Sequence, residues 1–591
     1  MSKMWTKTVG LVALVPLLAL PLSAQPCGDF QWANPRPQGN RLAGVAYGSG
    51  RYVAVGRAGT ILASADGIAW ERQTSNTRAD LWDVAWTGFL FAAVGDGGTA
   101  LTSSDGFVWS GQRTGTAASL REIVWNGTQF AAVGENGTIL TSPDAAFWTA
   151  RSSGTTRLLR SVAWSGDRFV AVGDVGTILV SSEGASWASR SFDGVDLLSS
   201  VAWDGSRFVV WANGFMSYGT VLTSRDGESW SAVAIGAYPQ MNAMLWTGAE
   251  LLAVGGFISA SPDGLRWARR AAPQQELYDL ASNGSGFVAV GDEGAIFTSR
   301  DGIAWEYRSP GVRGTIMDVA WDGSKYVAVG THGIILTSPD ASSWTPRASG
   351  NTGWIHALAW SGSRFVAVGE RGMILSSPDG IVWTRRDAAT GSFLLDVIWD
   401  GSRFLATGSE GIVLTSGDGE VWSQRALVAH NALYAVAWNG SQYVAVGGDL
   451  ARLIFSSPDG VNWTQRHSDN YGGLSDVIWN GSEFLAVGDG GSVWSSRDGI
   501  DWRRTDAGTS RALFGVAWTG SRYVAVGEDG VRAESPDGIG WSFFETGTTN
   551  DLFNVEWIGG RLLTLGRYGT ILTGDCPVAG SRSSRVKRFR D

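Results

Sequence analysis

A repeated unit of about 39 residues fills the chain from Leu42 to Cys576, and fourteen copies can be counted. In the copy from Ser161 to Trp187, short apolar runs alternate with turns rich in glycine and acidic residues. The tryptophan that ends the first run returns every 39 residues, at Trp86, Trp125, Trp164 and Trp203. Short alternating runs flanked by turns are typical of β-strands, and such repeats with four strands are typical of propeller blades. The sequence therefore predicts an all-β fold, a β-propeller protein with fourteen four-stranded blades.

The number of blades predicts two rings. Propellers typically have four to eight blades, and 591 residues are too many for one ordinary domain. We expect two seven-bladed propellers, over residues 25–317 and 318–576. Each propeller could close on itself, or the two chain ends could meet in one propeller, and the sequence leaves both arrangements open.

The first 24 residues predict a secretory signal peptide. Lys3 and Lys7 precede an apolar run from Val9 to Leu22, and small residues follow at a plausible cleavage site. The run is too short and too interrupted by proline for a membrane anchor, and we expect no membrane span elsewhere. The sequence thus predicts a secreted or periplasmic protein. The basic tail, residues 577–591, is expected to be disordered.

The two chain ends carry complementary parts of one repeat. Repeat fourteen stops after its third strand, and Phe30 to Trp32 aligns with the outer strand of the other repeats. A blade shared between the chain ends would leave no free sheet edge. Cys27 and Cys576 align with the same turn of the repeat, so we expect a disulfide between them in an oxidising compartment.

Thirteen repeats carry the pattern Ser-x-Asp/Glu-(Gly/Ala)-x-x-Trp before the outer strand, as in Ser64–Trp70 and Ser377–Trp383. Ser and Asp can accept backbone N–H groups within a turn, and Gly supplies a positive φ. Because thirteen copies cannot all be active sites, we interpret this turn as structural.

This turn resembles the Asp-box (BNR-like, YVTN-type) repeats of sialidase-like propellers. The wider unit, VAVGxxGTILxSxDGxxW, resembles the repeats of the photosystem II stability and assembly factor family over Leu42 to Cys576. That resemblance implies a non-enzymatic scaffold. The repeats are also similar to those of xyloglucanase-type glycoside hydrolases, which have two seven-bladed propellers. The chain departs from both: it lacks the long insertions that build a xyloglucanase cleft, and the turns matching the assembly factors' basic patch are mostly acidic.

Binding residues are expected on the face that carries the second-to-third-strand turns and the crossings between blades. This face is acidic and aromatic. Exposed aromatics suit sugar stacking or a protein hot spot, although turn chemistry and packing would also explain these residues. The candidates stand at or just before the first strand: Trp82, Asp83, Glu122, Arg160, Tyr278, Asp279, Asp318, Trp354, His356, Asp396, Tyr434 and Asp476.

Evidence for catalysis is weak. The four histidines have no metal-ligand spacing, so we expect neither a metal nor a cofactor. A glycosidase needs two nearby carboxylates, and nothing in the sequence singles out a pair. A net charge of −9 disfavours nucleic acid as a partner. The leading hypothesis is a secreted, non-enzymatic scaffold that binds a protein or glycan. The alternative is a polysaccharide-active glycoside hydrolase, and the oligomeric state stays open.

Overall fold

The computed structural model describes residues 26–35, 38–213, 219–236, 240–309, 311–312, 314–388, 390–427, 430–449 and 451–577. The expected signal peptide and all but the first residue of the basic tail lie outside the described residues. The described chain forms fourteen four-stranded sheets, which confirms the predicted β-propeller fold. Within these ranges, no helix has the length and apolar character needed to cross a membrane.

One blade shows how the repeat folds. Its strands β14 (Leu159–Trp164), β15 (Phe169–Gly173), β16 (Ile178–Ser181) and β17 (Ala188–Ser189) pair in chain order from the inner strand outwards. Leu159 pairs with Gly173 and Ser161 with Val172, so Arg160 is an extra residue, a β-bulge. Such a bulge commonly redirects a side chain. The same bulge occurs at the second residue of inner strands in both rings.

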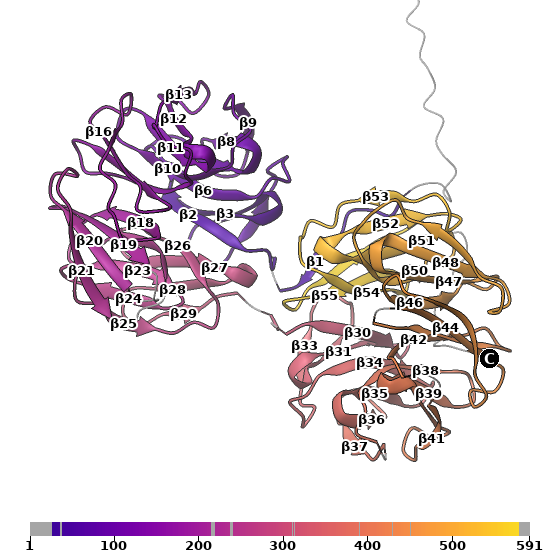
Figure 1. The fold of residues 1–591 in the computed structure, drawn as a ribbon. Helices are drawn as coiled ribbons and strands as arrows, with labels where there is room; N and C mark the ends of the chain where they lie inside the picture. The colour runs from indigo at the N-terminus through magenta and orange to yellow at the C-terminus, as the bar shows by residue number, and fades with distance from the viewer. Residues whose placement is uncertain are drawn as a thin grey trace, which may run out of the picture.

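The blades form two rings (Figure 1). The first inner strand, β2, contacts both β6 and β26, which closes one ring of seven blades. In the same way β30 contacts β34 and β54, which closes the second. The inner strands of the first ring are β2 (Leu42–Gly48), β6 (Leu81–Trp86), β10 (Leu120–Trp125), β14, β18 (Leu197–Trp203), β22 (Met241–Trp246) and β26 (Leu277–Ser282). Those of the second ring are β30 (Ile316–Trp321), β34 (Ile355–Trp360), β38 (Leu394–Trp399), β42 (Leu433–Trp438), β46 (Leu474–Trp479), β50 (Leu513–Trp518) and β54 (Leu552–Ile558).

The last blade is built from both chain ends. Strand β1 (Gln31–Asn34) pairs antiparallel with β56 (Ile571–Gly574) and completes the sheet of β54 and β55 (Arg561–Gly566). The predicted Cys27–Cys576 disulfide is present beside this pairing. The boundary expected from the sequence placed residues 25–34 in the first propeller, but the pairing of β1 with β56 moves this strand to the second. We therefore propose that the first propeller spans Leu42–Tyr307 and that the second spans Ile316–Gly574 together with β1.

The Asp-box turn has the structural role expected from its sequence. In the turn after β4 (Thr60–Ser64), the Ser64 hydroxyl accepts the Gly67 N–H at 2.9 Å. Asp66 accepts the N–H groups of Ile68 and Ala69 at 2.8 and 2.9 Å, and the Trp70 indole donates to the Gly67 carbonyl at 2.8 Å. Because backbone donors stabilise the charged form, the pKa of Asp66 is lowered. The turn thus uses its polar side chains internally.

A buried ion cluster holds the N-terminal segment in place. Glu534, on β52 (Arg532–Ser535), is 2% exposed and accepts hydrogen bonds from Arg532 Nε at 2.9 Å and Arg522 Nη1 at 3.0 Å. The Cys27 N–H donates to Glu534 at 3.1 Å, and Arg532 Nη2 donates to the Cys27 carbonyl at 2.9 Å. Arg532 also lies over the Phe30 ring, 4.3 Å from its centroid. The segment before β1 is therefore fixed by charge as well as by the disulfide.

Candidate binding site in the second propeller

The bulge residues of the second ring converge on one cavity. These residues, at the bulged position of each inner strand, are Met317, His356, Leu395, Tyr434, Ser475, Phe514 and Phe553. All of them line a cavity of about 490 Å³, so every blade of the ring contributes one side chain. The cavity also includes Asp318, Asp396, Asp476 and Asn554, each next to a bulge residue, and Asp449 and Asp489 from second-to-third-strand turns.

Asp318, Asp396 and Asp476 tie neighbouring blades together. Their carboxylates accept the backbone N–H groups of Leu358, Val436 and Val516, each on the next inner strand, at 2.7, 2.8 and 2.9 Å. They were expected on the exposed rim before the first strand. They lie instead within the strand and are only 2–4% exposed. The bulge turns the preceding residue towards the cavity, so the aspartate side chain points towards the neighbouring blade.

The polar side of the cavity is formed by two turns. The Tyr434 hydroxyl donates to Asp449, and Asp489 accepts the Gly473 N–H at 2.7 Å. Burial, the bond to Asp449 and the charges of Asp449 and Asp489 raise the pKa of Tyr434 well above its usual value. Tyr434 therefore stays protonated and serves as a hydrogen-bond donor.

Another part of the lining is aromatic and includes a neutral imidazole. Phe514 and Phe553 stack with ring centroids 5.5 Å apart. Burial lowers the pKa of His356, partly offset by the charge of Glu370, so the imidazole is uncharged at neutral pH. Trp354 is 45% exposed and lies outside the cavity lining, with its ring 6.1 Å from that of His356.

In the first ring the corresponding side chains are paired within the protein. The Trp82 indole donates to Asp96 at 2.6 Å and lies under Arg121. Arg160 forms an ion pair with Asp174 at 2.6 Å. The Tyr278 hydroxyl donates to Asp292 at 3.1 Å, and Arg41 pairs with the same carboxylate at 2.6 Å. These bulge residues hold the second-to-third-strand turns of their own blades.

Three carboxyl groups of the first ring have altered acidity. Asp83, Glu122 and Asp279 accept the N–H groups of Ile123, Val162 and Val45 on adjacent inner strands at 2.9, 3.0 and 2.7 Å. Burial raises the pKa of Asp279 to about 7. Burial and the charge of Asp279 raise the pKa of Glu122 to about 8, and the pKa of Asp83 is raised by burial and by both neighbouring carboxylates. Like their counterparts in the second ring, these residues connect blades.

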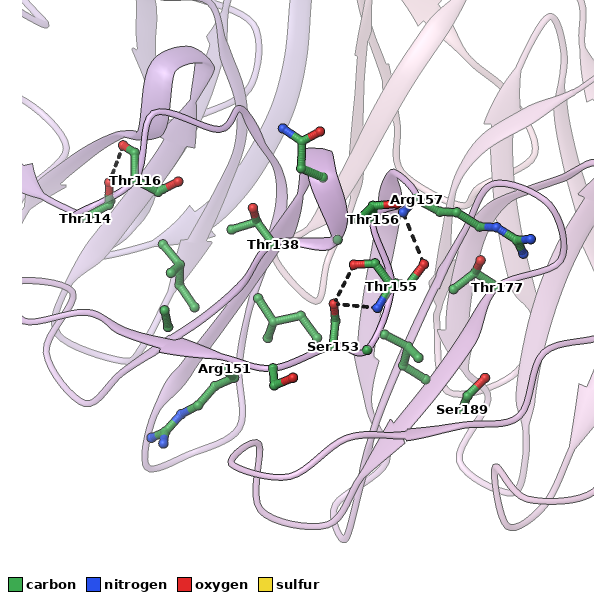
Figure 2. Close-up of a pocket in the computed structure, with 18 of the residues that line it drawn as sticks. Thr114, Thr116, Thr138, Arg151, Ser153, Thr155, Thr156, Arg157, Thr177 and Ser189 are labelled. Carbon is green, nitrogen blue, oxygen red and sulfur yellow. Dashed lines mark hydrogen bonds between the residues drawn. The ribbon is translucent and has the colours of Figure 1, made fainter.

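A second, larger hollow lies on the outside of the first ring. This groove, of about 930 Å³, lies between neighbouring blades along β13 (Thr149–Arg151) and β17. Figure 2 shows hydroxyl groups along its loop, where Ser153 accepts the Thr155 N–H and Thr155 accepts the Arg157 N–H. Its lining, all within the described chain, contains none of the candidate residues. Its polar loop is bonded to itself, which makes the second-ring cavity the better candidate.

The structure thus brings together Asp318, His356, Asp396, Tyr434 and Asp476 in one cavity and places Trp354 beside it. Sequence reasoning missed Met317, Leu395, Ser475, Phe514 and Phe553, which line the same cavity. A usable signal existed: each stands four residues before the last tryptophan of its inner strand. A role of the candidate residues in binding stays a prediction.

Comparisons with known proteins give no family assignment. No family model matches the chain, and no curated protein matches it. Among solved structures, it is similar to YCF48 from Cyanidioschyzon merolae, with 17% identity and a TM-score of 0.39 over 44% of this chain and 96% of that one. It is also similar to a structure of YCF48 bound to D1 peptide, with 17% identity and a TM-score of 0.39 over 47% of this chain and 99% of that one. The propeller assignment rests on the sheet topology described above.

Proposed function

We propose that the protein is a secreted or periplasmic, non-enzymatic scaffold that binds a protein or glycan partner in the central cavity of its second propeller. The observation that carries the proposal is the convergence of seven bulge residues, one from each blade, on a single cavity. Concave sites with an apolar wall and a few polar groups are typical ligand sites. The disulfide between Cys27 and Cys576 fits an oxidising compartment.

The rigidity of the inner strands supports a binding role. Asp318, Asp396 and Asp476 are committed to backbone N–H groups of adjacent blades, so they hold the ring together. Polar groups that are fixed before a ligand arrives reduce the entropy lost on binding. The resemblance of the repeats to the photosystem II stability and assembly factor family agrees with a scaffold role, and we propose no photosynthetic function from it.

A glycoside hydrolase is the second candidate, and one observation favours it. Glu122 has a pKa raised to about 8, close to what a general acid needs at neutral pH, and Asp279 is near enough to influence it. Against this role, Glu122 and Asp279 already accept backbone N–H groups of neighbouring strands. We therefore favour binding over hydrolysis.

The test is to incubate the mature protein with a panel of polysaccharides and peptides and to measure bound protein and new reducing ends in parallel. Retention without new reducing ends is the expected result. New reducing ends that disappear in Glu122→Gln would overturn the scaffold and establish the hydrolase. Retention that survives Phe514→Ala combined with Phe553→Ala would show that binding does not use this cavity.

A further inference from the structure

The cavity of the second propeller is lined by several carboxyl groups, and Asp449 and Asp489 reach it from exposed turns. Five aspartates line it, namely Asp318, Asp396, Asp449, Asp476 and Asp489, and its lining, all within the described chain, includes no lysine or arginine. Nearby carboxylates repel one another, the more strongly when they are partly removed from water. A positively charged ligand would relieve this repulsion.

The first ring provides an internal comparison. Its acidic turn residues Glu135, Asp174 and Asp292 form ion pairs with Arg121, Arg160 and Arg41, respectively. Asp489 stands at the same place in its turn as Asp174, directly after the last glycine of the second strand, but it bonds a backbone N–H group. In the first ring, arginines therefore neutralise these three turn carboxylates. In the second ring, the lining of the cavity provides no arginine for Asp489.

Two residues that line the cavity each have a buried polar atom without a hydrogen-bond partner in the described part of the chain. Asn554 is 7% exposed, and its amide N–H donates to Asp318 at 2.8 Å, but its Oδ1 accepts no hydrogen bond within the described chain. His356 Nε2 is likewise buried without a partner among these residues. Both flank the blade of Met317, since β34 and β54 contact β30. An unpaired buried amide oxygen such as Asn554 Oδ1 calls for a donor, and an ammonium or guanidinium group supplies several.

The shape and apolar lining favour an organic cation over a metal ion. No group of three histidine, cysteine, aspartate or glutamate residues in the described part of the chain is arranged to hold a metal ion. Phe514, Phe553, Met317 and Leu395 offer apolar surface beside the acidic side. Lysine and arginine combine an apolar stem with a charged end, and both interact favourably with aromatic faces.

We infer that this cavity receives the side chain of a lysine or arginine from a partner polypeptide. The inference rests on the proposed function, because it names the ligand of the same cavity. The apolar stem lies along Phe514 and Phe553, and the charged end reaches Asp449 and Asp489. A neutral sugar would bring no positive charge to Asp449 and Asp489, which favours a protein partner over a glycan.

Ligand-observed NMR with saturation transfer tests the inference, because it detects weak binding to a protein of 62.7 kDa. The probes are four alanine-glycine peptides of twelve residues that differ only at one central residue: lysine, arginine, norleucine or glutamate. We expect lysine and arginine peptides to bind at least tenfold more tightly than the norleucine peptide. Asp449→Asn combined with Asp489→Asn should remove that advantage. The matched control, Asp174→Asn in the first ring, should preserve it.

A second readout does not depend on the variants. Raising the salt concentration should weaken binding of the lysine peptide and leave binding of the norleucine peptide unchanged. Equal binding of the lysine and norleucine peptides would overturn the cationic ligand and leave the cavity as a binding site. Binding of neutral oligosaccharides with none of the peptides would also overturn it, with the scaffold role intact. Failure of the peptides and of the whole polysaccharide panel would defeat the proposed function itself.

Discussion

Neutralising Glu534 should destabilise the second propeller strongly. In Glu534→Gln, Arg532 and Arg522 would remain 1% and 5% exposed, with their shared carboxylate replaced by a neutral amide. Removing one member of a buried ion cluster typically costs about 3–5 kcal/mol, because the partner charge stays buried and uncompensated. For a domain of this size that corresponds to a fall in the melting temperature of roughly 6–20 °C.

Differential scanning calorimetry of the wild type and the variant measures this effect. The transition of the second propeller should shift, and that of the first should stay in place, because all cluster members lie in the second ring. The matched control is Glu545→Gln, which removes the same charge from the exposed ion pair with Arg78. Exposed pairs contribute at most about 1 kcal/mol. Equal shifts for Glu534→Gln and Glu545→Gln would refute the reasoning.

Three further predictions concern the closure, the acidity and the turns of the rings. Cys576→Ser should destabilise the second propeller by up to about 6 kcal/mol in the chain-entropy model, since 549 residues separate the cysteines. An unchanged midpoint of unfolding in urea would contradict this prediction. Because the pKa values of Asp279 and Glu122 are raised to about 7 and 8 in the folded state, the folded protein binds more protons than the unfolded chain between about pH 4 and 8. Stability of the first propeller should therefore fall as pH rises through that window, by up to about 1.4 kcal/mol per pH unit for each group, and urea titrations showing a flat or rising profile would disprove it. Gly137→Ala would place a Cβ 2.0 Å from the Thr155 carbonyl oxygen and should lower the free energy of unfolding by about 2–3 kcal/mol. Gly154→Ala, at a similar positive φ with open space around it, should lower it less. Equal losses of stability in thermal unfolding would argue against the clash.

Much of the fold could be predicted because each blade is specified locally. The alternating run Phe169–Gly173 and the turn Ser64–Trp70 carry their strand and turn information within a few residues. The shared blade could also be predicted, because Phe30–Trp32 and Cys27 match positions that every other repeat fills. The assignment of β1 to the second ring required knowing which inner strands meet, and that depends on contacts between β2 and β26.

The cavity was harder to predict because its residues share a place in the fold and little chemistry. Phe514, Ser475 and His356 occupy one bulged position, and only the register shift of each inner strand directs them to a common centre. The same shift explains why Asp318 was expected on the rim and is found between blades. Trp354 looked like a rim aromatic, and its exposure agrees with that, but the structure places it outside the cavity lining.

Blocking the cavity tests the central claim most directly. Trp82 shows that the bulged position tolerates tryptophan, so Ser475→Trp should fill the second-ring cavity without unfolding the blade, and Ala43→Trp is the matched substitution in the first ring. Isothermal titration calorimetry would measure the affinity of both variants for the tightest ligand of the panel. The proposed site predicts that Ser475→Trp abolishes binding and that Ala43→Trp leaves it at the wild-type value. Wild-type affinity in Ser475→Trp would contradict a binding function for the second propeller's cavity.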